Sequence, residues 1–377
     1  MINASTINIL LVQLFSNGDC LYATVVARQI KEDYPNCKLT WAISDFCKNI
    51  IANNPYVDEI LVTNEVAKND VVAFRKYKKK VFAEKAVGKW DEVFVTTNMD
   101  TNLALYDGTI RGMILRAYPN RITVPLQPVL ALTVSEKDNV ALFAKTHSIS
   151  HFKNVILWEF APQSRQTELN FEMVMSVAKK ITSNFSTCVI LSSANKFQGT
   201  DSIIDASTLS IRENAALTHY CSLLIGCSSG ITWLTTSSPA KFLPMLQLLN
   251  ANTIFINTPS LDFERYNIKH NGLIEMCNFN EDKILSCVNA ILNNGFFAAS
   301  AYNQQLPLQF NTTSTIVYNL LVYLAFSSIK KHYRIITTIY GRHPLFLRAF
   351  IKGFVTMPIK LSKNLWHKNY APKSKCY

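Results

Sequence analysis

Residues 7–30 read INILLVQLFSNGDCLYATVVARQI, and this stretch decides the fold class of the chain. Its apolar start is typical of a strand that is buried on both faces of a parallel sheet. The strand ends at a turn that contains Asn17, Gly18 and Asp19, and a helix begins at once. Such a turn directs backbone N–H groups and the positive end of a helix toward whatever lies beyond the strand.

The same pattern returns in the second half of the chain. Residues 223–234 read LLIGCSSGITWL, so a short apolar run again stops at a turn of small residues and a helix follows. This second turn carries no carboxylate, whereas the first carries Asp19. The two turns together predict a site with a proton acceptor on one side and an anion-binding turn on the other.

Strands and helices alternate along the whole chain of 377 residues, which is long enough for two or three domains. Strands are expected at 7–14, 39–43, 59–62, 92–97, 155–159, 188–192 and 223–225, and helices at 102–118, 136–146, 171–181, 212–220, 231–237 and 281–292. This alternation predicts an α/β fold of two parallel-sheet domains that face a cleft. We expect domains at 1–150 and 151–300, followed by a basic helical tail at 301–377.

The excess of positive charge lies entirely on the tail. The net charge is +12, and residues 283–377 carry 12 of the 38 Lys and Arg residues but no Asp or Glu. Residues 1–282 are therefore neutral, with 26 basic and 26 acidic residues. Basic residues mixed with Phe, Leu, Trp and Tyr indicate an anionic membrane surface as partner. We expect no nucleic-acid partner, because no recognition motif is present.

Residues 344–355 are expected to form a basic amphipathic helix. Its aromatic and basic residues recur every four positions, as Phe346, Phe350 and Phe354 and as Arg348 and Lys352. The helix either contacts a membrane or packs on the protein's own body, and the absence of nearby acids favours the membrane. Residues 316–329 are too short to span a bilayer, which needs about 20 residues, and predict a buried or interfacial helix.

The nine cysteines form no CxxC pair and no Cys/His ligand spacing. They predict free, mostly buried thiols in a reducing compartment and no metal site. The N-terminus lacks the basic segment of a signal peptide. We therefore expect a cytoplasmic protein that is peripheral on the inner face of the cell membrane.

Several segments resemble, in order, the family-9 glycosyltransferases, the group that includes the lipopolysaccharide heptosyltransferases. They are the Asn17-Gly18-Asp19 turn, KEDYPNCKLTWAI and NNPYVDEILV within 31–62, WDEVFVTT and DGTIRGMILRAYPNRI within 90–122, and LSIRENAALTHYCSLLIGCSSGITWL at 209–234. The resemblance implies a GT-B type fold of two Rossmann-like domains. The first would bind the acceptor and the second the nucleotide-sugar donor.

The resemblance gives Asp19 the role of catalytic base. An inverting glycosyl transfer needs a group that removes the proton of the acceptor hydroxyl, and Asp19 stands where the family has its proposed catalytic Asp. A purely structural role is the alternative, because Asp is a favoured residue at helix N-termini. The residues expected on the acceptor side are Asn17, Gly18, Asp107 and Arg111, with Arg111 facing an anionic acceptor.

The donor's leaving group is a nucleoside diphosphate, which needs N–H donors or positive charge as the bond breaks. The family supplies these without a metal. We also expect no cofactor, since the nucleotide sugar would be a substrate. The turn residues in position for this role are Ser228, Ser229, Gly230, Ile231 and Thr232. The loop after strand 155–159 offers Gln163, Ser164 and Arg165, which match the family's Ser/Thr-Lys loop, with Arg165 as the cation.

The chain departs from the family at the donor motif, which usually reads Asp-Ser-Gly-x-x-His. Ser228 and Trp233 stand at the ends of this motif here, which weakens the expectation that the donor is ADP-heptose. Trp233 either stacks on a base or sugar or belongs to the core.

Three functions stay open. The first is a metal-independent glycosyltransferase acting on a cell-envelope glycan or lipid-linked acceptor. The others are a GT-B nucleotide-sugar epimerase or hydrolase, and a non-catalytic binding protein on a transferase-like fold.

Overall fold

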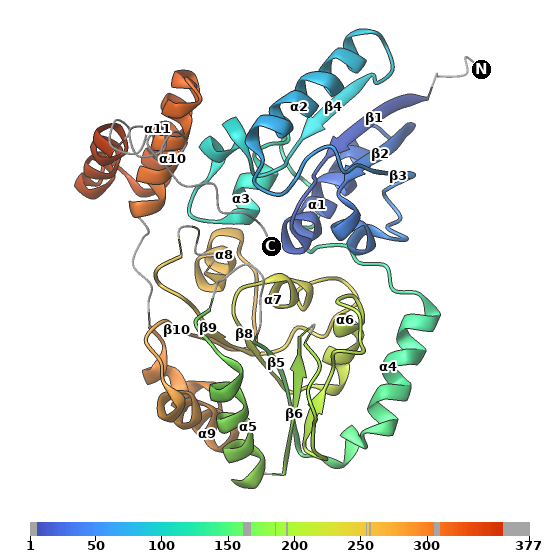
Figure 1. Ribbon diagram of the computed structural model, residues 1–377, viewed down its shortest axis with the longest axis vertical. Coiled ribbons are helices and arrows are strands. Elements are labelled where there is room, and N and C mark those ends of the chain that lie inside the picture. Colours follow the sequence, from blue (N-terminus) through green and yellow to red (C-terminus); the bar gives the residue numbers. More distant parts are fainter. Residues whose placement is uncertain are drawn as a thin grey trace, which may run out of the picture.

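The computed structural model describes residues 6–160, 167–184, 186–193, 195–253, 255, 258–304 and 310–356. Two parallel sheets with interleaved helices lie one above the other (Figure 1). The strands of the upper sheet come from residues 7–95 and those of the lower sheet from residues 154–276. The predicted α/β fold with two facing parallel sheets is thus confirmed.

The first sheet has the order β3-β2-β1-β4, with all its pairs parallel. Its strands are β1 (Ile7–Val12), β2 (Cys37–Ile43), β3 (Glu59–Val62) and β4 (Glu92–Val95). As the apolar run predicted, β1 is central and buried on both faces. Ile9 and Leu11 pack into the core beneath helix α1 (Asn17–Asp33), whereas Leu10 and Val12 pack into the core beneath α2 (Val71–Ala86).

The second sheet has six parallel strands in the order β10-β9-β8-β5-β6-β7. They are β5 (Asn154–Glu159), β6 (Thr187–Ser192), β7 (Ile203–Asp205), β8 (Leu223–Gly226), β9 (Met245–Leu248) and β10 (Leu273–Met276). In both sheets the strand order reverses at a central strand. The reversal lies between β1 and β4 in the first sheet and between β5 and β8 in the second. Parallel sheets bind ligands at such points, beyond the carboxyl ends of the strands.

The remaining helices cover the sheets and connect them. They are η1 (Asp45–Ile51), η2 (Asp100–Leu105), α3 (Ile110–Leu115), α4 (Val134–Thr146), η3 (Ile149–His151), α5 (Phe171–Asn184), α6 (Glu213–Leu217), η4 (Thr218–Tyr220), α7 (Gly230–Leu234), α8 (Pro259–Tyr266), α9 (Glu281–Ala298) and η5 (Ala299–Tyr302). The helix expected over 102–118 is instead two short helices, η2 and α3. Helix η2 ends because the backbone is extended at Tyr106, and Gly108 lies between the two helices with a φ of 103°, which glycine adopts readily.

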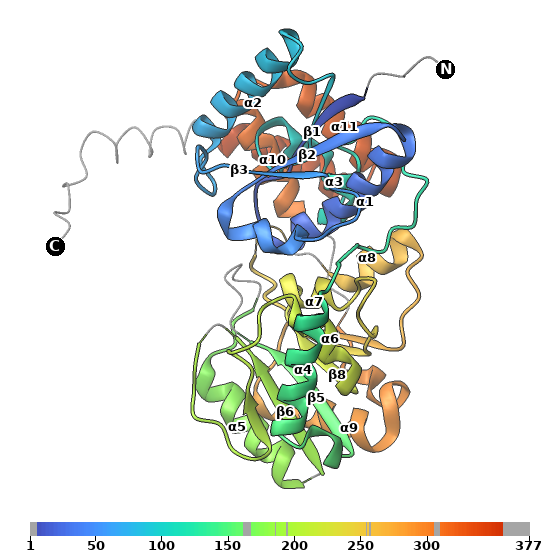
Figure 2. The same ribbon diagram turned by 90° about the vertical axis from the view of Figure 1, so that its right-hand side faces the viewer.

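The C-terminal helices return to the first half of the molecule. Helices α10 (Phe310–Val322) and α11 (Phe326–Tyr340) and a last helix over 344–356 lie beside η2 and α3 (Figures 1 and 2). Apolar residues of α10, such as Ile316 and Leu320, share a core with Leu105 and Met113. The helical tail is thus confirmed for residues 310–356, and it packs on the first sheet's half of the molecule.

Of the described residues, only the stretch Glu281–Tyr302 is apolar and long enough to cross a membrane. Its apolar face belongs to the core of the second half, where Ile284, Cys287 and Val288 are fully buried. One face of α9 therefore packs into the core of the second half.

Candidate functional site

A cavity of about 490 Å³ lies between the facing edges of the two sheets. The residues that line it stand at or after the carboxyl end of a strand, as expected for parallel sheets. The first half contributes Asn17, Gly18, Phe46, Asn49 and Lys68, among others. The second half contributes Glu159, Ser192, Ser193, Ser229, Gly230 and Ile231, among others.

The two glycine turns that the sequence singled out meet at this cavity. A Cβ atom on Gly18 would lie 3.8 Å from the Cα of Gly230, and one on Gly230 would lie 3.7 Å from the Cβ of Asn17. These are ordinary van der Waals separations, so the start of α1 touches the start of α7 across the two halves. Five of the sequence-predicted residues therefore lie around one cavity: Asn17, Gly18, Ser229, Gly230 and Ile231.

Asp19 lies in the first turn of α1, next to Gly18, and is half-buried. Its carboxylate accepts a hydrogen bond of 3.0 Å from the Nδ2 of Asn98, which follows the neighbouring strand β4. Burial raises the pKa of Asp19 to about 7, although the bond from Asn98 and the charge of Lys68 both lower it. A carboxylate that titrates near neutral pH is suited to act as a general base.

The alternative role of Asp19 as the N-cap of its helix is wrong. Ser16 holds the N-cap position of α1, with a φ of 48°. Within the described residues, no side chain caps this helix end. The Asp19 carboxylate is directed instead to Asn98, on the loop after β4.

Lys68 is a candidate binding residue that the sequence analysis missed. It is exposed on the loop between β3 and α2, and among the described residues that line the cavity it is the one cation. The basic side chains of Arg75 and Lys80, on the helix α2 that follows, are paired with acids. Asp70 could have indicated in the sequence that Lys68 lies on a loop before the helix. It is the N-cap of α2, and its side chain accepts a hydrogen bond of 2.9 Å from the N–H of Ala73.

The anion-binding turn at the start of α7 already holds a carboxylate of the chain itself. Glu159, the last residue of β5, accepts hydrogen bonds from the hydroxyl of Ser229, from the N–H of Ile231 at 3.4 Å and from the Oγ1 of Thr232 at 3.4 Å. Burial raises the pKa of Glu159, and the bond from Ser229 lowers it. A phosphate that used these donors would meet the Glu159 carboxylate.

The structure therefore corrects the expectation that all of residues 228–232 are open to a phosphate. Ser229, Gly230 and Ile231 line the cavity, whereas Ser228 and Thr232 do not and are 4% and 0% exposed. Thr232 is turned inward because its hydroxyl contacts Glu159 and, at 3.2 Å, the Oε1 of Gln247.

Asp107 and Arg111 were expected on the acceptor side, but they do not face an acceptor. Arg111 is 1% exposed, and its Nε donates to both carboxylate oxygens of Asp262, at 3.0 and 3.2 Å. Asp107 is fully buried and accepts a hydrogen bond of 2.9 Å from the Nη1 of Arg265. Because Asp262 and Arg265 belong to α8, these pairs join the two halves of the molecule.

Trp233 belongs to the core between the halves. It is 2% exposed, and its ring lies 5.2 Å from that of Tyr22 and 6.1 Å from that of Phe263. The core interpretation of Trp233 is therefore the correct one. Gln163, Ser164 and Arg165 lie outside the described residues, and their donor role stays a prediction.

The fold can be compared with known proteins. No protein-family model and no curated protein matches the chain. Among solved structures, it is similar to a glycosyl transferase of family 9 from Veillonella parvula DSM 2008, with a TM-score of 0.53 and 13% sequence identity. The match covers 89% of this chain and 99% of that one. The chain has the fold of a family-9 glycosyltransferase.

Two further structures are similar at lower scores. E. coli ADP-heptose lps heptosyltransferase II has a TM-score of 0.49 and 15% identity, over 76% of this chain and 98% of that one. A putative UDP-N-acetylglucosamine 2-epimerase from Listeria monocytogenes has a TM-score of 0.46 and 9% identity, over 85% of this chain and 97% of that one.

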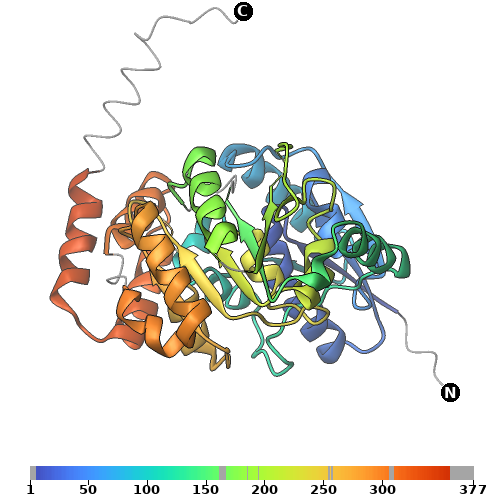
Figure 3. The same cartoon turned by 90° about the horizontal axis from the view of Figure 1, so that it is seen from below.

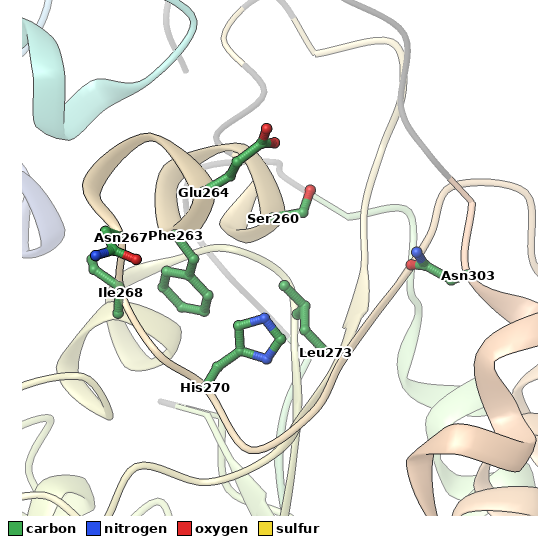
Figure 4. Close-up of a pocket in the computed structure, with 8 residues that line it drawn as sticks. All are labelled: Ser260, Phe263, Glu264, Asn267, Ile268, His270, Leu273 and Asn303. Atoms are coloured by element: carbon green, nitrogen blue, oxygen red, sulfur yellow. The ribbon is translucent and has the colours of Figure 1, made fainter.

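A second cavity, of about 460 Å³, lies beside α8 and β10 (Figure 4). The side chains of Phe263, Leu273 and His270 lie together beneath α8, and none of the sequence-predicted site residues lines this cavity. Within the described ranges, no cluster of three or more His, Cys, Asp or Glu side chains could hold a metal ion. The cavity between the sheets is the candidate site, because five of the sequence-predicted residues line it.

Proposed function

We propose that the chain is an inverting, metal-independent glycosyltransferase that moves a sugar from a nucleotide-sugar donor to a cell-envelope glycan or lipid-linked acceptor. The observation that carries this proposal is Asp19, a carboxylate with a pKa of about 7 that directly follows Gly18, a residue lining the cavity between the carboxyl edges of two parallel sheets. The family-9 glycosyltransferase fold supports it.

In the proposed reaction, the acceptor hydroxyl oxygen attacks the anomeric carbon of the donor sugar and gives its proton to Asp19. A carbon–oxygen bond forms to the acceptor, and the bond to the nucleoside diphosphate breaks. Asn98 orients the Asp19 carboxylate through its bond of 3.0 Å. The developing charge on the diphosphate would be met by Lys68 and by the hydroxyl of Ser193, which both line the cavity.

Lys68→Met is expected to weaken binding of a nucleoside diphosphate about 10- to 100-fold, because one hydrogen bond to a charged group is worth about 1.5–3 kcal/mol. The affinity for the uncharged nucleoside should not change. Calorimetric titration with each ligand measures both effects. Lys76→Met, which removes the same charge from the exposed face of α2, is the matched control. An equal loss for nucleoside and diphosphate would contradict the assignment.

Glu159→Gln is expected to tighten binding of a nucleoside diphosphate about tenfold, equivalent to about 1.4 kcal/mol. The amide keeps an oxygen that can accept from Ser229 and Ile231 but carries no charge to repel a phosphate. The control is Glu172→Gln, an exposed glutamate at the start of α5. Weaker binding by Glu159→Gln would show that the carboxylate holds the turn in its binding conformation and does not compete with the phosphate.

The proposed function is tested by thermal unfolding of the full chain with ADP, UDP, GDP, CDP and CMP. A nucleotide at a hundredfold excess over its Kd adds about 2.7 kcal/mol to the free energy of unfolding. One stabilising nucleotide would identify the donor class. Turnover of the matching nucleotide sugar without an acceptor would favour an epimerase or hydrolase. No stabilisation by any nucleotide would favour a non-catalytic binding protein.

A further inference from the structure

The last described helix, over residues 344–356, has one face that is fixed to the body of the protein. Phe346, Ala349 and Phe350 are buried against the neighbouring helices. A Cβ atom on Gly353 would lie only 2.7 Å from the Cβ of Val317, so glycine allows this helix to cross α10 closely. The body is therefore one partner of this helix, but only of one face.

The opposite face of the same helix exposes large apolar side chains. Leu347 is 58% exposed, Ile351 55%, Phe354 47% and Val355 61%. Their spacing of three or four residues places them on one stripe of the helix. Soluble proteins usually expose such side chains singly, whereas a continuous apolar stripe marks an interaction surface. We call this surface the outer face, and it consists of Leu347, Arg348, Ile351, Lys352, Phe354 and Val355.

The charge around the outer face has a single sign. Residues 310–356 contain six Lys and Arg residues and no Asp or Glu, and Arg348 and Lys352 stand on the outer face itself. Helix α11 runs beside it, where the ring of Tyr333 lies 5.3 Å from that of Phe350. An apolar stripe flanked by basic residues fits the boundary between lipid tails and anionic headgroups. A surface that binds an ordinary protein partner would not need to lack Asp and Glu.

We propose that the outer face of helix 344–356 docks on an anionic lipid bilayer. The apolar side chains enter the headgroup boundary, and the basic ones attract the anionic lipids. The docking helix lies at one side of the molecule, beside α10 and α11, as Figure 3 shows. These helices share a core with η2 and α3. The half of the molecule that contains Asp19 would therefore bind the bilayer. The membrane docking stands independently of the proposed function. Delivery of a lipid-linked acceptor to Asp19 rests on that function.

Vesicle flotation with the full chain tests the proposal. The chain is expected to float with vesicles of phosphatidylcholine and phosphatidylglycerol and to stay unbound with phosphatidylcholine alone. The double variant Leu347→Gln with Ile351→Gln should bind anionic vesicles at least about tenfold more weakly, because it removes two apolar anchors. Arg348→Gln with Lys352→Gln should bind about fivefold more weakly per charge.

The matched control is Val134→Gln with Leu142→Gln on α4, two residues that are 74% and 62% exposed. It should bind vesicles like the natural chain, and thermal unfolding should show that all variants fold. Unchanged vesicle binding by the Leu347 and Ile351 variant would overturn the proposal. So would binding of a short DNA duplex that depends on the same two residues, which would make nucleic acid the partner. Vesicle binding without nucleotide binding would leave the docking intact and remove the proposed transferase.

Discussion

Asp19→Asn is expected to lower the rate of sugar transfer by about 10²–10⁴-fold, the range that a positioned general base contributes. Asparagine keeps the size of the side chain and an oxygen that can accept the 3.0 Å bond from Asn98. It cannot accept the proton of the acceptor hydroxyl. Nucleotide affinity should be retained, because the donor's phosphates would contact Lys68 and the turn of α7. Single-turnover transfer and calorimetric titration measure the two effects separately.

The pH dependence of transfer follows from the pKa of Asp19, which is about 7. Only the ionised carboxylate can take up a proton, so the rate should rise about tenfold per pH unit below pH 7 and become constant above it. Asp45→Asn, which removes an exposed carboxylate paired with Lys48, should leave this profile unchanged. Transfer by Asp19→Asn at the natural rate would end the assignment of Asp19 as the base.

The same pKa gives a second measurement that needs no activity. Burial raises the pKa of Asp19 from 3.8 to about 7, so between these values the folded chain holds a proton that the unfolded chain has released. The free energy of unfolding should therefore decrease as the pH rises through this range. Asp19→Asn should lack this contribution. Urea unfolding at several pH values compares the natural chain with the variant.

The fold could be predicted where the signals are local. The junctions that form β1–α1 and β8–α7 each combine an apolar run with a glycine turn, and both lie at the carboxyl edge of a parallel sheet as expected. The strands β7, β9 and β10, of three or four residues each, were missed, whereas β3 and β8, which have four residues each, were predicted. Runs of that length do not show a periodicity that separates a strand from a buried loop.

The site could be predicted only in part, because its contacts join residues far apart in the sequence. Arg111 was expected to face an acceptor, but its carboxylate partner, Asp262, lies 151 positions further along the chain. Glu159 ends an apolar strand, and nothing in its neighbourhood indicates that it meets the turn 70 positions later. Lys68 stands in a basic segment that is typical of a solvated helix face. In each case the tertiary fold decides what the charge contacts.

The buried pair Arg111–Asp262 should dominate the stability of the contact between the two halves. Both side chains are almost completely buried, with 1% and 0% exposure, and the Nη1 of Arg111 also donates to the carbonyl of Leu126 at 2.9 Å. Asp262→Ala leaves the guanidinium buried without its carboxylate. We expect the free energy of unfolding to fall by about 3–5 kcal/mol, the usual result of removing one member of a buried ion pair. Chemical denaturation measures the loss.

Two further variants separate this pair from ordinary packing effects. Arg111→Met with Asp262→Leu should regain most of the stability, because apolar residues of similar volume often replace a buried pair at little cost. Glu281→Ala breaks a half-exposed pair with Lys180 and should cost at most about 1 kcal/mol. A loss from Asp262→Ala no larger than that from Glu281→Ala would contradict the role of the pair. Arg111 belongs to α3 and Asp262 to α8, so the pair joins the half that contains Asp19 to the half that contains the α7 turn. If Asp262→Ala shows the large loss and unfolds in two transitions, the pair couples the folding of the two halves.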